Sequence, residues 1–380
     1  MKLCIVTASV KKGDGQARVN YEIVQAAIAR QHRVTLVVSQ AAPELIANQL
    51  IKCIYFVVKN MPTELIRGII FSQKSASWLK KHEHEFDVVM GCGAVTSART
   101  DVNVVHFVHS TWLNSPFHTS RVSRNLYGAY QWMFTALNAR WERQAFKKAR
   151  ILIAVSETIK QELIEIGVPE AKIQVILNGV DIDEFFPATW ATLGRSLLRS
   201  LYGLPEKVDL ALFVGDFRTN RKNLDTVLKA LVNVPNLHLA VVGSAEKSPY
   251  PQLAKQLGLD KRVHFLGYRS DVAKIMQAVD FLVFPSRYEP FGMVVSEAMA
   301  AGLPVITTLV SGVAAIVTPE CGIVLADSED IQALTDALVI LTGDGSLRKK
   351  MGKAARAIAE QHSWTSKANA YVDLFESMVS

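Results

Sequence analysis

Two glutamates eight positions apart are the residues of this sequence best suited to chemistry on a sugar or a ribose. Glu289 lies in a loop, and Glu297 lies in the first turns of the helix expected after it. Pro290 and Gly292 let the backbone turn sharply, and a helix start presents unpaired N–H groups that bind phosphate or carbohydrate oxygens. One carboxylate can accept hydrogen bonds from hydroxyl groups while the other stabilises an oxocarbenium-like centre. Two acids alone favour a simpler interpretation, a helix-dipole partner and an exposed loop acid.

Cationic side chains also precede the helix expected at 224–231. Arg218, Arg221 and Lys222 follow an apolar strand expected at 210–214 and precede a helix expected at 224–231. Two adjacent cations before a helix N-terminus can hold a diphosphate group. An exposed basic turn explains them equally well.

In the first half, His109 and two glycines are the candidates for a site. His109 follows an apolar strand and opens onto a loop at its carboxyl end, although a lone histidine is more often packed or solvated. Gly13 and Gly15 precede a helix, as in a dinucleotide-binding turn, but Arg18 replaces the third glycine and residues 39–40 are Ser and Gln where such a fold has an acid. A nicotinamide dehydrogenase is therefore disfavoured, while a phosphate or a sugar can still approach the backbone closely.

The sequence predicts no metal site and no cofactor. Asp181 and Asp183 form the Asp-x-Asp pair of metal-dependent sugar transferases, but two acids at this spacing recur by chance. Four widely separated cysteines without a Cys-x-x-Cys pair exclude a disulfide framework and a zinc ribbon. A reducing cytosol fits this cysteine usage best.

Strand-like apolar runs alternate with helical patterns along the chain, which predicts an α/β fold of parallel sheets. In such sheets ligands lie beyond the carboxyl ends of the strands, where the candidate loops are expected. A break near 187–204 predicts two doubly wound, Rossmann-like domains, 1–187 and 188–363, with a final helix at 364–380 packing back on the first. Strands are expected at 3–8, 34–38, 54–57, 88–90, 104–108, 151–155, 174–176, 210–214, 237–242, 263–266, 281–284, 305–308 and 322–325. Helices are expected at 16–29, 64–79, 126–148, 157–166, 224–231, 250–257, 272–279, 293–301, 331–341, 347–358 and 367–378.

Length and composition indicate a compact globular protein. The 380 residues allow two or three domains, and the 49% hydrophobic and 20% charged residues exclude a disordered or fibrous chain. The uncharged stretch 298–317 is long enough to span a membrane, but Gly302 and Pro304 interrupt any helix there. We expect helix, turn and strand in that stretch. With only a short apolar N-terminus and no cleavage pattern, a cytoplasmic location is expected.

The net charge of +7 is concentrated in the first half, because residues 1–188 include 22 basic and 16 acidic residues. Segment 106–150 holds seven basic residues and a single acid, Glu142, together with nine aromatic residues. Such a segment suits nucleic acid, an anionic membrane surface or an anionic sugar acceptor. A solvated helix face whose aromatic side chains lie in the core is the alternative.

The stretch 289–306 strongly resembles the Glu-x7-Glu signature of retaining family-4 glycosyltransferases with the GT-B fold. Shorter matches, in the family's order and spacing, extend the resemblance over nearly the whole chain: 153–157, 176–181 with 186–187, 213–215 with 221–222, 263–267, and the helix that begins at 363–364.

The resemblance implies that the first domain binds an acceptor and the second a nucleotide sugar, with a cleft closing between them. It implies Glu297 on the ribose hydroxyls, Glu289 beside the donor sugar, and Arg221 and Lys222 on the diphosphate. Asp216 stands where many members have an arginine, so Arg218 or Arg221 is expected to supply the second phosphate contact. The other positions implied at the donor are Gly15, Gly267, Tyr268, Arg269, Phe291, Gly292, Met293 and Val294, with His109 as a second catalytic residue.

The expected activity is the retaining transfer of a hexose from a nucleotide-diphosphate sugar, UDP-glucose, to a sugar or lipid-linked saccharide in polysaccharide or glycolipid synthesis. Retention by a covalent intermediate and by same-face attack are both open. A GT-B phosphorylase or trehalose-type synthase is the nearest alternative, and a nicotinamide oxidoreductase or a non-catalytic nucleotide-sugar-binding module are alternatives of other classes. The basic segment predicts peripheral contact with the inner membrane face, and no nucleic-acid partner is expected.

Overall fold

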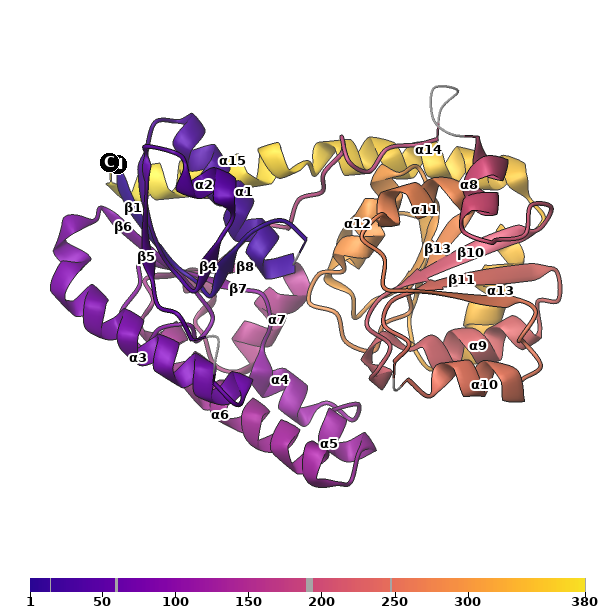
Figure 1. The fold of residues 1–380 in the computed structure, drawn as a ribbon, viewed down its shortest axis with the longest axis horizontal. Helices are drawn as coiled ribbons and strands as arrows, with labels where there is room; N and C mark the ends of the chain where they lie inside the picture. Colours follow the sequence, from indigo (N-terminus) through magenta and orange to yellow (C-terminus); the bar gives the residue numbers. More distant parts are fainter. Residues whose placement is uncertain (14, 59–60, 189–193, 247, 380) are drawn as a thin grey trace. The chain divides into compact units, whose positions relative to one another are not determined.

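A computed structural model describes residues 1–13, 15–58, 61–188, 194–246 and 248–379. They form two compact units, each a parallel sheet covered by helices on both faces, which confirms the predicted fold class (Figure 1). Unit 1 holds residues 1–179 and the C-terminal helix α15 (Trp364–Val379), and unit 2 holds residues 180–363. The division falls before the boundary placed at 187, because Val180 pairs with Ser363 and its N–H donates to the His362 carbonyl at 2.9 Å.

The sheet of unit 1 has seven strands in the order β5-β3-β1-β6-β7-β8-β9. The chain runs from β1 through β3 to β5 on one side and resumes at β6 on the other side of β1. The strand order of this sheet therefore reverses between β1 and β6. The strands are β1 (Lys2–Val6), β3 (Arg33–Val38), β5 (Ile51–Tyr55), β6 (Val88–Cys92), β7 (Val102–Val105), β8 (Ile151–Ala154) and β9 (Ile173–Val175), with a small pair β2 (Ser9–Val10) and β4 (Gln40–Ala41) beside them.

Helices cover both faces of this sheet. On one face α1 (Gly15–Ala29) packs along α15, and Arg30 ties them by donating to Asp373 at 2.6 Å and Glu376 at 3.0 Å. On the other face α3 (Glu64–His82) packs through Phe71 and Leu79 (Figure 1). The remaining helices are α2 (Pro43–Ile46), α4 (His109–Asn114), α5 (Thr119–Val122), α6 (Leu126–Lys148) and α7 (Glu157–Glu165).

Unit 2 repeats the architecture with six parallel strands in the order β12-β11-β10-β13-β14-β15. A large buried hydrophobic cluster lies between the sheet and α9, α10 and α13. The strands are β10 (Asp209–Val214), β11 (Leu237–Val242), β12 (Val263–Gly267), β13 (Phe281–Val283), β14 (Val305–Thr308) and β15 (Gly322–Leu325). The helices are α8 (Arg195–Leu201), α9 (Leu224–Val232), α10 (Tyr250–Gln256), α11 (Val272–Ala278), α12 (Met293–Ala300), α13 (Ile331–Leu341) and α14 (Gly345–Gln361).

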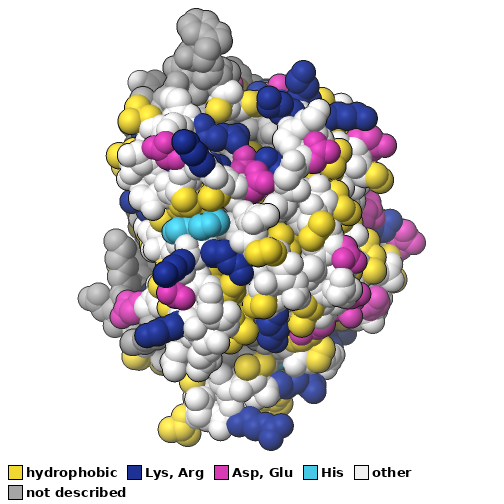
Figure 2. Space-filling model, turned by 90° about the vertical axis from the view of Figure 1, so that its right-hand side faces the viewer, with side chains coloured by type: hydrophobic (Ala, Val, Ile, Leu, Met, Phe, Trp, Pro, Cys, Tyr) yellow, Lys and Arg dark blue, Asp and Glu magenta, His cyan; other side chains and the backbone are white. Residues whose placement is uncertain are grey.

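Several expectations can be compared directly with these elements. The helix predicted at 126–148 is confirmed by α6, and the uncharged stretch 298–317 folds as the end of α12, a turn, β14 and a 3-10 helix. The strand predicted at 54–57 is wrong by three residues at its start, and α4, α5 and α8 were not predicted. None of the described helices combines the length and the hydropathy needed to cross a membrane. Over the face drawn in Figure 2, basic side chains are interspersed with acidic ones.

Candidate functional site

Two loops of unit 2 meet between β10 and β13, where the order in which the chain adds strands to the sheet reverses. β10 and β13 are hydrogen-bonded neighbours, yet the chain visits β11 and β12 on the far side of β10 before it returns to β13. Ligands of open α/β sheets bind at such a reversal, beyond the carboxyl ends of the strands. The loop after β10 carries Arg221 and Lys222, and the loop after β13 carries Glu289.

Hydrogen bonds lock these two loops together. The backbone N–H of Arg287 and the hydroxyl of Ser286 both donate to the Arg221 carbonyl, at 2.9 and 3.1 Å. The Arg287 guanidinium is buried and forms ion pairs with Asp225 at 2.8 Å and with Glu329 at 2.7 Å. Charge-assisted bonds of this kind hold a loop in one geometry. Lys222 and Glu289 therefore lie on a rigid support.

Lys222 and Glu289 form an ion pair at this support. Their side chains are only 14% and 12% exposed, and the Lys222 ammonium lies 5.0 Å from the centre of the Phe284 ring. Burial lowers the pKa of Lys222, although the Glu289 carboxylate favours its charged form. The structure thus brings together the acid and one of the cations that the sequence singled out separately.

A sharp turn at Gly292 starts the helix that carries Glu297. Gly292 has φ +100°, and a Cβ there would lie 3.1 Å from Val313 and 3.3 Å from the Glu289 side chain. The positive φ favours glycine because other residues rarely adopt it, and the close contacts leave little room for a side chain. Phe291 lies before this turn, and Met293 and Val294 form the first turn of α12, whose N–H groups have no partner within the helix. Glu297 follows in the next turn and is half-buried.

Two of the predicted cations already have carboxylate partners close by in the chain. Arg218 donates to Asp216 at 2.6 and 2.9 Å, which lowers the pKa of Asp216. Arg269 donates to Asp271 at 2.8 Å with both of its bonds and lowers the pKa of that carboxyl to about 2. Arg221 is half-buried beside Lys222. The geometry therefore favours Arg221 over Arg218 as the second cation.

The carboxyl end of β12 contributes the last predicted positions of unit 2. Gly267 has φ +70°, and its carbonyl accepts the N–H of Gly243 at 2.9 Å. Tyr268 follows it and is 80% exposed.

In unit 1 the structure places Gly15 and His109 at helix starts. Gly15 is the first residue of α1, and the neighbouring Asp14 lies outside the described residues. His109 is the first residue of α4 rather than part of a loop, because a short helix forms there that the sequence did not reveal. Its Nδ1 lies 2.9 Å from a carboxylate oxygen of Glu142 on α6.

Glu142 is a residue of this site that the sequence reasoning missed. Its side chain is 1% exposed, and it accepts the N–H groups of His109 at 3.0 Å and of Ser110 at 2.9 Å together with the Ser110 hydroxyl. A carboxylate at a helix start satisfies unpaired N–H groups and interacts favourably with the helix dipole. Its signal was present: Glu142 is the single acid in the basic segment 106–150.

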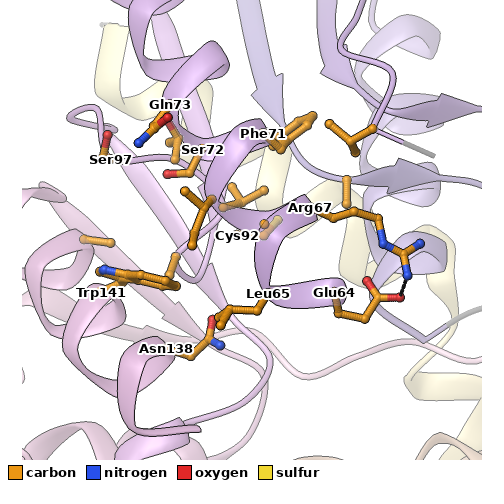
Figure 3. A pocket seen from close by; sticks show the side chains of 18 of the residues that line it. Glu64, Leu65, Arg67, Phe71, Ser72, Gln73, Cys92, Ser97, Asn138 and Trp141 are labelled. Atoms are coloured by element: carbon orange, nitrogen blue, oxygen red, sulfur yellow. Dashed lines mark hydrogen bonds and ion pairs between the residues drawn. The ribbon is translucent and has the colours of Figure 1, made fainter. Parts of the chain in front are cut away.

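A pocket of about 800 Å³ opens in unit 1 beside His109. Helices α3 and α6 form two of its walls, and Gln16 of α1, His109 of α4 and residues at the carboxyl ends of the strands complete the lining. In Figure 3, Trp141 and Asn138 of α6 lie opposite Leu65 and Ser72 of α3.

In the described part of the chain, no three His, Cys, Asp or Glu side chains are grouped as metal ligands would be. Asp181 instead accepts the backbone N–H groups of Asp183 and Glu184 at 3.1 and 2.9 Å. Its carboxylate stabilises the turn where unit 2 begins.

Known proteins resemble this chain in both halves. Residues 195–358 match the family model of the group 1 glycosyl transferases, and residues 13–184 match that of glycosyltransferase family 4. A D-inositol 3-phosphate glycosyltransferase of Xylanimonas cellulosilytica is 32% identical over 62% of this chain and 58% of its own length. The lipopolysaccharide glucosyltransferase WaaG of Escherichia coli is 36% identical over 44% of this chain and 46% of its own. The matched part thus spans about half the length of these relatives.

Solved structures share the whole fold. A crystal structure of WaaG has a TM-score of 0.76 at 24% identity and covers 98% of this chain and 99% of its own. The Anabaena protein HepE, solved with UDP-glucose, has a TM-score of 0.72 at 22% identity and covers 99% of this chain and 100% of its own. The two family matches and this shared pair of parallel-sheet domains establish that the chain belongs to the family-4 glycosyltransferases with the GT-B fold.

Proposed function

We propose that the protein transfers a hexose from UDP-glucose to a saccharide acceptor with retention of the anomeric configuration. The observation that carries the proposal is the largely buried ion pair of Lys222 and Glu289, which lies where the strand order of unit 2 reverses between β10 and β13. A fixed cation suits a diphosphate, and a fixed carboxylate suits the positive charge that develops on a sugar as its bond breaks. The glucosyltransferase name of one relative and the UDP-glucose held by a structural neighbour support this choice of donor.

In this proposal the residues have separate duties. Arg221, Lys222 and the N–H groups at the start of α12 stabilise the negative charge of the departing nucleoside diphosphate. Glu297 accepts hydrogen bonds from the ribose hydroxyls, and Glu289 stabilises the donor sugar. His109, held by Glu142 through Nδ1, presents Nε2 to the sugar or its phosphate.

Transfer without a metal ion is part of the proposal, because the cations and the helix start can neutralise the leaving group. Activity is expected to persist in EDTA. Complete loss of activity in EDTA that manganese restores would contradict this part.

The test of the function is a transfer assay with UDP-glucose labelled in the sugar. We expect UDP release together with an α-linked product, since the donor is itself α-linked. NMR of the anomeric proton distinguishes an α-linked from a β-linked product. A β-linked product would contradict retention. In a separate assay without UDP-glucose, cleavage of a glycosidic bond of a saccharide by inorganic phosphate to give a sugar phosphate would favour the phosphorylase alternative instead.

We further propose that unit 1 contacts an anionic membrane surface, where a lipid-linked acceptor is found. The segment formed by α5 and the start of α6 exposes Val122, Leu126, Tyr127 and Trp132, and Leu126 is 91% exposed. Arg121 and Arg124 are exposed in the same segment. Aromatic and basic side chains together favour the surface of an anionic bilayer.

A further inference from the structure

The loop after β10 carries an acid among its cations. Asp216 comes two residues after the strand ends, and Arg218, Arg221 and Lys222 follow it. In the proposed function this loop binds the diphosphate of the donor, at the carboxyl end of the strands. A carboxylate has the same sign of charge as that ligand, so Asp216 opposes the binding that the cations favour.

A buried aromatic side chain holds this part of the loop in place. Phe217 is 0% exposed and belongs to the hydrophobic cluster between the sheet and α9 and α10. Its carbonyl accepts the hydroxyl of Ser248 at 3.0 Å. Because Phe217 is turned into the core, the residues before and after it, Asp216 and Arg218, are both exposed. The two charged side chains therefore lie together on the outer surface of the loop.

Asp216 holds Arg218 through three hydrogen bonds. Its Oδ1 accepts the backbone N–H of Arg218 at 3.1 Å and the Nε at 2.9 Å, and its Oδ2 accepts Nη2 at 2.6 Å. A guanidinium bound side-on through Nε and one terminal nitrogen uses the same pair of donors that recognises a phosphate. The carboxylate of Asp216 therefore occupies the position on Arg218 that a diphosphate oxygen pair would take.

This ion pair lies close to the cations that the proposed function assigns to the diphosphate. Gly215, the residue before Asp216, packs against the Lys222 side chain, since a Cβ on Gly215 would lie 3.4 Å from the Lys222 Cγ. Arg218 above all lowers the pKa of Asp216, and the charge of Arg221 contributes to the same shift. Asp216 thus remains ionised at neutral pH and belongs to the same group of charges as the diphosphate site.

We propose that Asp216 holds Arg218 away from the diphosphate and thereby limits how tightly the protein binds UDP. The inference rests on the proposed function and goes beyond it, because it assigns to Asp216 a role that opposes binding. The side chains of Arg218 and Asp216 are 58% and 47% exposed, and an exposed ion pair contributes little free energy. The restraint is therefore modest, and it shortens the time that UDP occupies the site after transfer.

Asp216→Asn tests this inference, because it removes the charge and keeps the size of the side chain. Calorimetric titration at neutral pH is expected to show UDP binding about fivefold tighter than in the wild type. The gain should be smaller for UMP and absent for uridine, since the released guanidinium contacts only phosphate. A structural disturbance of the loop would change the affinity for all three ligands.

The double variant Asp216→Asn/Arg218→Gln identifies the group that produces the gain. Its affinity for UDP is expected to return close to the wild-type value, because the gain requires the released Arg218. Asp260→Asn is the matched control, since Asp260 is an exposed acid in the loop before β12, at the opposite end of the strands. This control should leave UDP affinity unchanged.

Three results would overturn the inference while leaving the proposed function intact. They are equal UDP affinity in the wild type and Asp216→Asn, the full gain retained in the double variant, and an equal gain in Asp260→Asn. The second would show simple repulsion by Asp216, and the third a response to total charge. Absence of UDP binding by both the wild type and Asp216→Asn would instead overturn the proposed function and this inference with it.

Discussion

The two glutamates of the signature stretch occupy different surroundings, so their substitutions should have different effects. Glu289 is largely buried against a lysine, whereas Glu297 lies half-buried in the helix that follows. Glu289→Ala is expected to lower kcat on the order of 100-fold, because it removes charge stabilisation that is strongest in the transition state. Glu297→Ala is expected mainly to raise the dissociation constant for UDP-glucose. Steady-state kinetics and calorimetry separate the two effects, and equal, wild-type behaviour of both variants would refute the assignment.

Lys222 should give nucleotide binding an unusual pH dependence. Its protonated amine attracts a diphosphate, and burial lowers its pKa. Affinity for UDP therefore falls as the pH rises through this lowered pKa, at a lower pH than for an ordinary lysine with a pKa of about 10.4. Lys222→Arg should move the loss to higher pH, and Lys222→Ala should weaken binding by about 1.5–3 kcal/mol.

Calorimetric titration of UDP between about pH 7 and pH 10 measures this effect. Lys255→Ala serves as the control, since Lys255 is exposed on α10. If the lysine were only part of a structural ion pair, Lys222→Ala would leave UDP affinity unchanged.

At the scale of elements, α4 is held by a residue far away in the sequence. Val108 provides no side-chain cap for this six-residue helix, and Glu142, 33 positions after His109, accepts its first N–H groups instead. Glu142→Ala leaves these buried donors without a partner, and each costs about 1–3 kcal/mol. Urea unfolding should show this loss, together with reduced transfer.

Glu165→Ala is the comparison for this prediction, because Glu165 is an exposed acid at the end of α7 and its removal should change the free energy of unfolding by less than about 0.5 kcal/mol. Equal unfolding midpoints for the two variants would show that α4 does not depend on Glu142.

The elements also explain how far the sequence could predict this protein. The long helix α6 was predicted in full because its buried residues recur at helical spacing over 23 residues. By contrast, α4 has only six residues and no side-chain cap of its own, and it depends on a distant carboxylate. β5 was misplaced because it is an edge strand in which no residue is fully buried, so its sequence lacks the apolar run of a central strand. In the same way the Glu289 loop and the cation pair were each visible in the sequence, but their contact requires β10 and β13 to be neighbours. That adjacency is a property of the topology and not of either segment.

At the scale of the whole molecule, the uneven charge of the chain should determine whether it binds to lipid membranes or stays in solution. The basic excess belongs to residues 1–188, while 20 basic residues nearly balance 19 acidic ones over 189–380. Vesicles with anionic lipids are expected to co-sediment the protein, and neutral vesicles are not. The interaction should weaken as salt is raised, because the charges involved are exposed.

Reversing Arg121, Arg124 and Arg140 to glutamate should abolish this binding, since each basic residue near an anionic bilayer contributes about 1 kcal/mol and three amount to roughly a hundredfold change in partitioning. Arg143 is left unchanged because it donates to Ser110 beside His109 at 3.2 Å. Reversal of the three exposed lysines of α14, Lys349, Lys350 and Lys353, changes the net charge equally and should leave binding intact if the contact is local to unit 1. Equal losses in both triple variants would instead indicate a response to total charge, and equal recovery of the wild type with both kinds of vesicle would make α5 and α6 an ordinary solvated surface.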